Sequence, residues 1–185
     1  MKKIIKAPFK KEDIRDLKAG DKIYIEGTIY TARDAAHQRL LKSLDAGEEL
    51  PIDIEGAVIY YCGPSPARPG QVIGSAGPTT SGRMDSLTIP LLEKGMLGMI
   101  GKGERSSEVE EAIKENKAVY MVALGGAGAL MAKSIEEATV VAYEDLGAEA
   151  IRELKVFEFP VIVVIDSKGK NLYRMGRKQY EVEEG

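Results

Sequence analysis

The sequence predicts an α/β domain, and three features of the chain indicate it. Short apolar segments rich in β-branched and aromatic residues alternate with segments of helical spacing, and glycine-rich turns lie between them. With 185 residues, 44% of them hydrophobic, the chain can bury about 70% of its unfolded surface as one compact unit. We expect one domain over residues 21–185, preceded by an arm of residues 1–20 that packs on the main body or on a neighbour.

The first half of this domain begins with a strand and a helix. DKIYIEGTIYTA (21–32) alternates Ile and Tyr with polar or small residues, which is typical of a half-buried strand. The following segment ends at Gly47 and is predicted to be helical from the spacing of Ala36, Leu40, Leu41 and Leu44. GAVIYYCGP (56–64) is a short apolar run closed by Gly-Pro, so a buried strand is expected there, followed by a loop rich in proline and glycine.

The second half repeats the alternation. Strands are predicted over 96–103, 118–124, 139–147 and 156–166. Helices are predicted over 82–95 and 109–117, and the second of these has a capping box that begins at Ser107. A short helix is predicted after the glycine-rich turn at 125–128, and another over 148–154. Gly169 in DSKGKNLY predicts a tight hairpin connection to a last strand at 171–173.

Composition and charge exclude several classes of partner. The 26 basic and 29 acidic residues give a pI near 5.4, so no electrostatic field gathers nucleic acid or anionic lipid. The longest apolar runs, such as VIVVI at 161–165, are far shorter than a membrane span, and MKKIIKAPF lacks the apolar stretch of a secretory signal. We expect a cytoplasmic protein that binds neither nucleic acid nor membrane.

The chain has one cysteine, Cys62, and one histidine, His37. They exclude an internal disulfide and are too few for a self-contained zinc or iron–sulfur site, so any metal chemistry needs ligands from elsewhere. Cys62 at the end of YYCGP is interpreted as a small buried hydrophobe. His37, one turn into its helix, is interpreted as a surface or supporting group.

Glycine-rich turns before predicted helices provide candidate anion sites at GSAGPTTSGRMD (74–85), IGKGERSS (100–107) and LGGAGAL (124–130). Helix N-termini carry unpartnered N–H groups and partial positive charge. Arg83 lies beside the first of these turns and Lys102 beside the second, and Arg33 lies at the start of the first predicted helix. A planar guanidinium suits a carboxylate bidentately and an ammonium acts as a point charge, so the set fits a small multi-anionic ligand. The candidate residues are Arg33, Thr79, Thr80, Ser81, Arg83 and Lys102.

Simpler interpretations remain open for the same segments. Gly-Pro-Thr-Thr is by itself a turn and a helix N-cap, and GGAGAL is interpreted as close packing rather than ligand contact. Neither has the spacing of a dinucleotide-binding or Walker loop, so nucleotide binding is disfavoured. Asp85, two residues after Arg83, either orients that arginine or takes part in chemistry.

Six segments together resemble the β subunit of class I fumarase and of its relative L(+)-tartrate dehydratase. They are TARDAAH (31–37), YYCGP (60–64), IGSAGPTTSGRMD (73–85), IGKG (100–103), GGAGAL (125–130) and FPVIVVIDSKGKNLY (159–173). The resemblance spans residues 21–173. It implies a swivelling three-layer β/β/α domain that closes over a [4Fe-4S] cluster held by an α subunit, in an assembly suggested to be α2β2.

By motif, the resemblance places substrate-binding roles on Arg33, Arg83, Lys102 and Thr79, with Thr79, Lys102 and Arg83 also catalytic and Thr79 the candidate base. The implied reaction is the reversible conversion of L-malate to fumarate and water, a C4 dicarboxylate hydro-lyase reaction of the fumarate hydratase type. An L(+)-tartrate dehydratase β subunit and a non-catalytic dicarboxylate-binding domain are the alternatives, and a phosphate-binding α/β domain is disfavoured because no Walker spacing is present.

Overall fold

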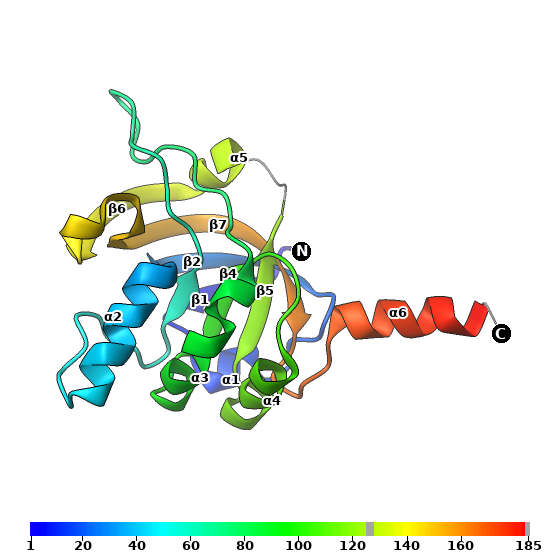
Figure 1. Cartoon of the computed structure of the whole chain (residues 1–185). Coiled ribbons are helices and arrows are strands. Elements are labelled where there is room, and N and C mark those ends of the chain that lie inside the picture. Colours follow the sequence, from blue (N-terminus) through cyan, green and yellow to red (C-terminus); the bar gives the residue numbers. More distant parts are fainter. Residues whose placement is uncertain (125–127, 184–185) are drawn as a thin grey trace.

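A computed structural model describes residues 1–124 and 128–183, with side chains through residue 178 (Figure 1). The strands are β1 (Ile4–Ala7), β2 (Lys22–Thr31), β3 (Val58–Tyr60), β4 (Gly98–Gly101), β5 (Val119–Ala123), β6 (Ile135–Ala142) and β7 (Ile151–Ile165). The α-helices are α1 (Lys11–Ile14), α2 (Asp34–Asp45), α3 (Asp85–Glu93), α4 (Ser107–Asn116), α5 (Gly128–Ala132) and α6 (Leu172–Glu183). Two 3-10 segments are η1 (Ser81–Met84) and η2 (Glu144–Glu149).

The strands close on themselves. Their order is β1-β2-β3-β4-β5-β7-β6, and β2 pairs with β7 as well, so β2, β3, β4, β5 and β7 form a closed ring. Pairing is parallel from β1 through β5 and antiparallel wherever β7 takes part. Because the parallel strands β3 and β4 point the same way as β2, their carboxyl ends meet at one edge of the ring.

Strand β7 holds the ring together. One of its edges pairs with β2 over residues 152–162, while the other pairs with β6 near its beginning and with β5 near its end. Figure 1 shows β7 curving across the molecule beside β6 and β2. This strand therefore joins the antiparallel part of the sheet to the parallel part.

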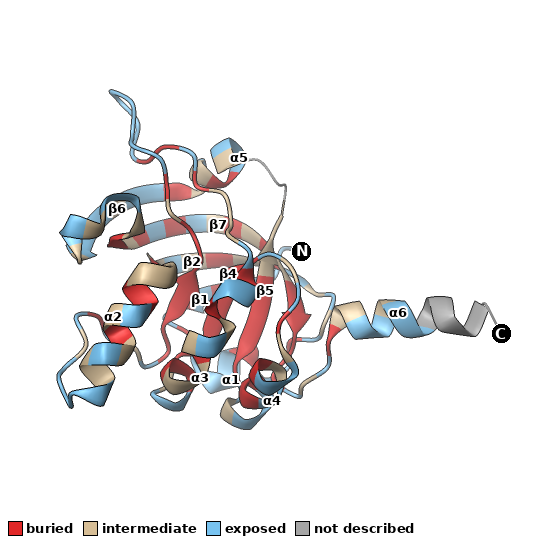
Figure 2. Ribbon diagram, viewed as in Figure 1, coloured by how far each residue is buried: buried red, intermediate tan, exposed pale blue. Residues whose placement is uncertain are grey.

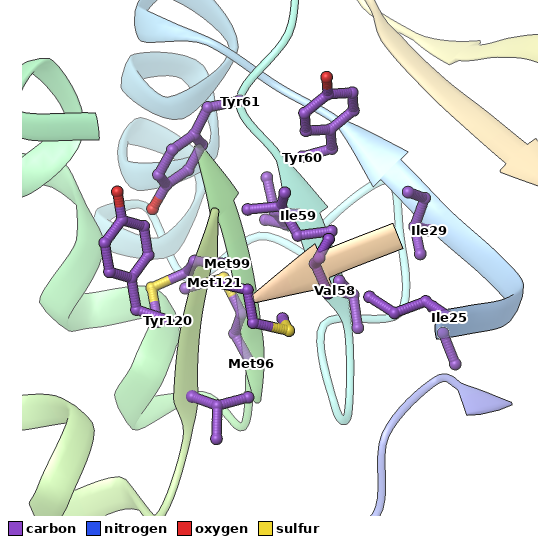
Figure 3. Close-up of a cluster of buried hydrophobic side chains, with 14 of the residues drawn as sticks. Ile25, Ile29, Val58, Ile59, Tyr60, Tyr61, Met96, Met99, Tyr120 and Met121 are labelled. Carbon is purple, nitrogen blue, oxygen red and sulfur yellow. The ribbon is translucent and has the colours of Figure 1, made fainter. Parts of the chain in front are cut away.

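Helices α2, α3 and α4 lie side by side over the parallel strands. Figure 2 shows those strands buried behind the helices, whose outer faces are exposed. Every residue of β3 and β4 is buried, which explains why both read as continuous apolar runs. Figure 3 shows part of the resulting core, where Val58 and Ile59 of β3 pack near Met99 of β4 and Met121 of β5.

Most predicted elements are confirmed, and the α/β class with them, but four segments differ. The strand predicted over 139–147 ends at Ala142, and residues 144–147 belong to η2 instead. Residues 148–154, predicted as a helix, instead end η2 and begin β7. Residues 171–173, predicted as a strand, lead into α6, although the turn around Gly169 is present, since Asp166 N–H donates to the Lys170 carbonyl at 3.0 Å. The N-cap of α4 is Ser106 rather than Ser107, because its hydroxyl accepts from Val109 N–H at 3.3 Å.

The first 20 residues pack on the main body. Strand β1 pairs with β2, and Phe9, Ile14 and Leu17 are buried in the same core. At the other end α6 projects away from the body (Figure 1). None of the described helices is long and apolar enough to cross a membrane.

Candidate functional site

Two of the predicted motifs pair with each other through an isolated parallel bridge at the carboxyl edge of β3 and β4. The Thr79 N–H donates to the Tyr61 carbonyl at 2.7 Å, just past the end of β3. Lys102, just past β4, donates its N–H to the Thr79 carbonyl at 3.3 Å and accepts from the Ser81 N–H at 2.9 Å. Segment 79–81 therefore lies between the ends of β3 and β4 and extends the sheet there by one parallel pairing, in which Thr80 is opposite Lys102. This short pairing is called the added rung below.

A close approach makes this arrangement possible at Gly101, the last residue of β4. A Cβ built on Gly101 would overlap the Ser81 hydroxyl and would lie 2.8 Å from the Tyr61 ring. Any side chain there would push segment 79–81 away from the strand ends. The glycine of IGKG that precedes the lysine is thus required by packing inside the domain.

One predicted arginine, Arg83, pairs with the acidic residue that follows the other, Arg33. Arg83, in η1, lies with both Nε and Nη2 3.2 Å from Asp34 Oδ2, and Asp34 is the first residue of α2, directly after Arg33. Arg33 packs against Gly63, where a Cβ would lie 3.0 Å from Arg33 Cδ and Nη1. The nearest carboxylate oxygen to Arg33 Nε belongs to Glu149, at 4.0 Å. The structure thus places Arg83 on the residue next to Arg33, while the Arg33 side chain lies against Gly63 and near Glu149.

The Thr79–Lys102 pair and the Asp34–Arg83 pair are joined by the chain, because η1, which carries Arg83, begins at Ser81, the last residue of segment 79–81. Arg83 is four residues from Thr79 and half exposed, and the Lys102 side chain is exposed. In the part of the chain that the structure describes, Lys102 forms no salt bridge, since the neighbouring Glu104 pairs with Arg177 at 2.6 Å. Two arginines, one lysine and one threonine therefore follow the ends of β2, β3 and β4, and residues of these types can bind a small molecule with two carboxylates.

The helix-cap interpretation of Gly-Pro-Thr-Thr is not what the structure shows. Thr80 precedes η1, but its side chain makes no capping hydrogen bond. The turn in LGGAGAL falls partly on residues 125–127, outside the described residues. Gly128, which follows them, accepts from the Ala76 N–H at 3.1 Å, so this part of the motif packs against the loop that leads to Thr79.

Several buried polar atoms at the start of α2 have no hydrogen-bond partner among the described residues. They are Arg33 Nε, Asp34 Oδ1 and His37 Nε2. Buried polar groups are normally satisfied, so unpartnered ones at one helix turn make this turn a candidate place for a bound water or ligand. The site prediction from sequence missed Asp34, although its place next to Arg33 in RDAAH, in the first turn of a helix, was a usable signal.

His37 is fully buried, which excludes the surface interpretation and leaves that of a supporting group. Its Nδ1 lies 2.7 Å from the Arg33 carbonyl, which can only accept, so Nδ1 carries the hydrogen and Nε2 is a bare acceptor. The ring packs edge-on against Tyr61 at 5.5 Å between centroids. Burial lowers the pKa of His37 to about 4, so the imidazole is neutral near neutral pH.

This pKa predicts a dependence of folding stability on pH. The unfolded histidine has a pKa of about 6.5, so as the pH falls from 6.5 to 4 the unfolded chain binds a proton that the folded chain does not. The free energy of unfolding should therefore fall by about 3 kcal/mol across this window through His37 alone. Urea unfolding at several pH values, compared with His37→Gln, measures it: the variant should lose this part of the slope. Parallel curves for the two proteins would contradict the assignment.

Cys62 is buried, as expected, and burial raises the pKa of its thiol to about 12. Within the described residues no three His, Cys, Asp or Glu side chains gather to hold a metal ion. A single buried thiol far above its ordinary pKa does not fit as a ligand set for an iron–sulfur cluster. Asp85 does not orient Arg83 either: it accepts from Arg105 Nε at 2.6 Å and from Ser106 N–H at 2.7 Å.

The fold and the site define an α/β domain whose parallel strands end in an edge of cationic and hydroxyl side chains. Comparison with known proteins then gives its family. Residues 2–176 match the family model described as Fumarase C-terminus, and the chain belongs to this family. The resemblance inferred from the motifs is confirmed.

Individual relatives fall in two groups. Over 174 residues the chain is 37% identical to Fumarate hydratase 2 of Leishmania major, covering 91% of this chain and 30% of that protein. It is 40% identical over 156 residues to the anaerobic class I fumarate hydratase of Escherichia coli, covering 83% and 28%. It is 36% identical over 185 residues to the L(+)-tartrate dehydratase subunit beta of Escherichia coli, covering 97% and 90%. The chain thus spans under a third of the fumarate hydratases and nearly the whole tartrate dehydratase subunit; both names denote hydro-lyases.

Proposed function

We propose that this chain is the β subunit of an iron–sulfur hydro-lyase that interconverts L-malate with fumarate and water. The observation that carries the proposal is the pairing of Thr79 with Lys102 at the strand edge, continuous with the Arg33–Asp34–Arg83 group. Relatives of both kinds act on C4 dicarboxylic acids by their names. Cationic side chains bind carboxylates strongly, and the candidate set contains three of them.

The cationic residues would bind and orient the substrate. Asp34 uses the Nε and Nη2 side of the Arg83 guanidinium, so its Nη1 and Nη2 end is the one that a substrate carboxylate would take in a bidentate contact. Arg33, held against Gly63, would take the second carboxylate. Two arginines fixed at separate points of the edge would set the direction in which the substrate lies.

The proton step would fall on Thr79. Removing the C3 proton of malate places further negative charge on the adjacent carboxylate, so a cation fixed there stabilises the transition state more than the ground state. Lys102 would be that cation, since its backbone is bonded directly to Thr79. A threonine hydroxyl is a weak base at its ordinary pKa, and the surrounding positive charge would lower the energy of its deprotonated form.

The cluster would belong to an α subunit, because the residues of this chain do not fit it. A separate α subunit is supported by the length match with the tartrate dehydratase subunit beta and by the short share of the fumarate hydratases that this chain covers. When bound there, the cluster would supply an open iron as a Lewis acid. We further propose that the two subunits form an α2β2 assembly in the cytoplasm. Sedimentation of the purified complex would measure its mass.

We also propose that the domain is a three-layer β/β/α unit that swivels against its partner. The division of the sheet supports the layers: β1, β2, β6 and β7 lie on one side, and β3, β4 and β5 with their helices on the other (Figure 1). A change in the X-ray scattering profile of the complex on adding a dicarboxylate would test the motion. An unchanged profile would contradict it.

The deciding experiment is co-expression with the neighbouring chain, anaerobic cluster reconstitution, and assay on fumarate, L-malate and L(+)-tartrate. Turnover of fumarate and malate by the complex, with none by this chain alone, is the expected result. Preference for tartrate would instead favour the second candidate, a tartrate dehydratase β subunit, which the 90% coverage of that relative supports. Dicarboxylate binding without turnover would leave a binding domain, and turnover by this chain alone would contradict the division of labour.

A further inference from the structure

Arg105 carries a fully buried charge that the proposed mechanism does not use. Its side chain is 0% exposed, and its guanidinium reaches three oxygen atoms and, from Nη1, the Met99 sulfur at 3.7 Å. Nε donates to Asp85 Oδ1 at 2.6 Å, Nη1 to the Tyr61 hydroxyl at 3.2 Å and Nη2 to the Thr88 hydroxyl at 3.0 Å. The group also lies between two aromatic rings, with Cζ 5.2 Å from the centroid of Tyr61 and 4.9 Å from that of Tyr120.

Such a group is an unusual choice for stability alone. Taking a guanidinium and a carboxylate out of water is unfavourable, and apolar residues of similar volume stabilise a core as well or better. Burial by itself lowers the pKa of Arg105, but Tyr61 and Asp85 raise it above the ordinary value, so the charge persists. A charge retained at this depth, with every donor group directed, points to a role in holding geometry.

The partners of Arg105 are the residues that hold the site. Tyr61 accepts from Arg105 Nη1 through its hydroxyl and from the Thr79 N–H through its carbonyl. It therefore connects Arg105 to the candidate base. Asp85 begins α3, two residues after Arg83, and its second oxygen accepts from Ser106 N–H at 2.7 Å. This carboxylate therefore ties the segment after Arg83 to the segment after Lys102.

Tyr120 completes the connection from β5. Its hydroxyl lies 2.7 Å from both the Ser81 hydroxyl and the Gly103 carbonyl. A carbonyl can only accept, so Tyr120 donates to Gly103 and Ser81 donates to Tyr120. Figure 3 shows Tyr61 and Tyr120 near each other, while Tyr60 points to the opposite side of the strand end. The two rings thus enclose Arg105 and fix the residues on either side of the added rung.

We propose that Arg105 is a positioning residue: it locks segment 79–85 to segment 101–106, so that Thr79, Arg83 and Lys102 keep one relative placement. The proposal rests on the proposed function for its catalytic consequence and on the contacts alone for its structural one. A residue in the core would thus fix the positions of candidate site residues at the carboxyl ends of β3 and β4. The sequence reasoning missed Arg105, whose only signal was an arginine three residues after Lys102 in IGKGERS.

The test uses two variants with different severity. Arg105→Lys keeps the charge but cannot reach Asp85, Tyr61 and Thr88 together. Tyr120→Phe keeps the ring and removes only the hydroxyl that joins Ser81 to Gly103, so it folds even where the first does not. A matched control is Asp166→Asn, a buried carboxylate at the far hairpin that accepts from Ala19, Lys168 and Lys170 N–H groups at 3.0–3.1 Å.

Two readouts separate positioning from stability. In the reconstituted complex, Arg105→Lys should lower kcat by about 100-fold with a much smaller change in KM, and Tyr120→Phe should lower kcat by about 10-fold. In the full chain alone, amide hydrogen exchange at Ser81 and Lys102 should become about 10-fold faster, with exchange in the β2–β7 ladder unchanged. Asp166→Asn should lower the thermal midpoint without moving kcat or these two amides.

The outcomes distinguish this proposal from the proposed function. If the wild-type complex turns over none of the three acids, the proposed function fails and the amide exchange still decides whether Arg105 holds the segments. If both variants exchange at Ser81 and Lys102 as slowly as the wild type, the positioning role is overturned. It is equally overturned if the exchange quickens but kcat stays within about two-fold of the wild type.

Discussion

Thr79→Ala in the reconstituted complex is expected to lower kcat by about 1000-fold, with little change in KM. A base that takes a proton in the transition state contributes roughly 100-fold to 10000-fold, whereas the arginines that bind the carboxylates remain in place. The backbone of Thr79 is held through both its N–H and its carbonyl, so removing the hydroxyl leaves the rung intact. Steady-state kinetics with malate, together with exchange of the C3 hydrogen with solvent deuterium, measure the effect.

Two companion variants control for this result. Thr79→Ser keeps a hydroxyl and should recover most of the activity. Thr28→Ala removes a half-buried threonine from β2 and should leave kcat unchanged. A Thr79→Ala enzyme with turnover within a few-fold of the wild type would make Thr79 a binding residue and would remove the proposed base.

Lys102→Met is the second substitution with a large expected effect, a loss of about 1000-fold in kcat/KM. Removal of one preorganised donor from the charge that develops in a transition state typically lowers the rate by about 100-fold to 1000-fold, and here a full positive charge is lost. Methionine keeps the unbranched shape and most of the length of the side chain. The backbone bonds of residue 102 to Thr79 and Ser81 do not depend on the side chain, so the fold should be unaffected.

Thermal unfolding should therefore show no difference between Lys102→Met and the wild type. The matched control is Lys168→Met, an exposed lysine of the distant turn at 166–170, which should keep full activity. Equal losses for the two variants would mean that net charge rather than the ammonium at position 102 is what matters. An unchanged kcat/KM in Lys102→Met would exclude Lys102 from the reaction.

Much of the fold was predictable because local and tertiary preferences agree. Strand β2 and helix α2 were predicted within two residues of their observed ends, since their periodicities of two and 3.6 are clear. The failure at 148–154 has a physical cause. Ile151 and Leu154 are spaced like a helix face, but pairing with β2 on one edge and β6 on the other stabilises a strand there. Ring closure through β7 depends on pairs far apart in sequence and left no local signal.

The candidate residues could be chosen from the sequence, but their arrangement could not. Glycine, threonine and cation motifs at strand ends identified Thr79, Arg83, Lys102 and Arg33 as candidates. The interposition of segment 79–81 between β3 and β4 was not predictable, because an unpatterned loop precedes it. Asp85 faces inward to Arg105 rather than outward to Arg83, and no spacing rule states which of two nearby arginines a carboxylate selects.

The loop that leaves the sheet at Tyr61 and returns at Thr79 has a property useful to protein engineers. Its two arms are tied at a neck, where the Ser65 N–H donates to the Ser75 carbonyl at 3.0 Å and the Ser75 N–H to the Ser65 hydroxyl at 2.8 Å. Beyond the neck the tip at 66–72 is exposed. Because the neck fixes both ends of the tip, a longer tip should not shift the position of Thr79. The stability cost should also be small, because the closure entropy of a loop grows only slowly with its length. We therefore expect an epitope tag or a fluorescent reporter inserted there to leave the candidate site in place.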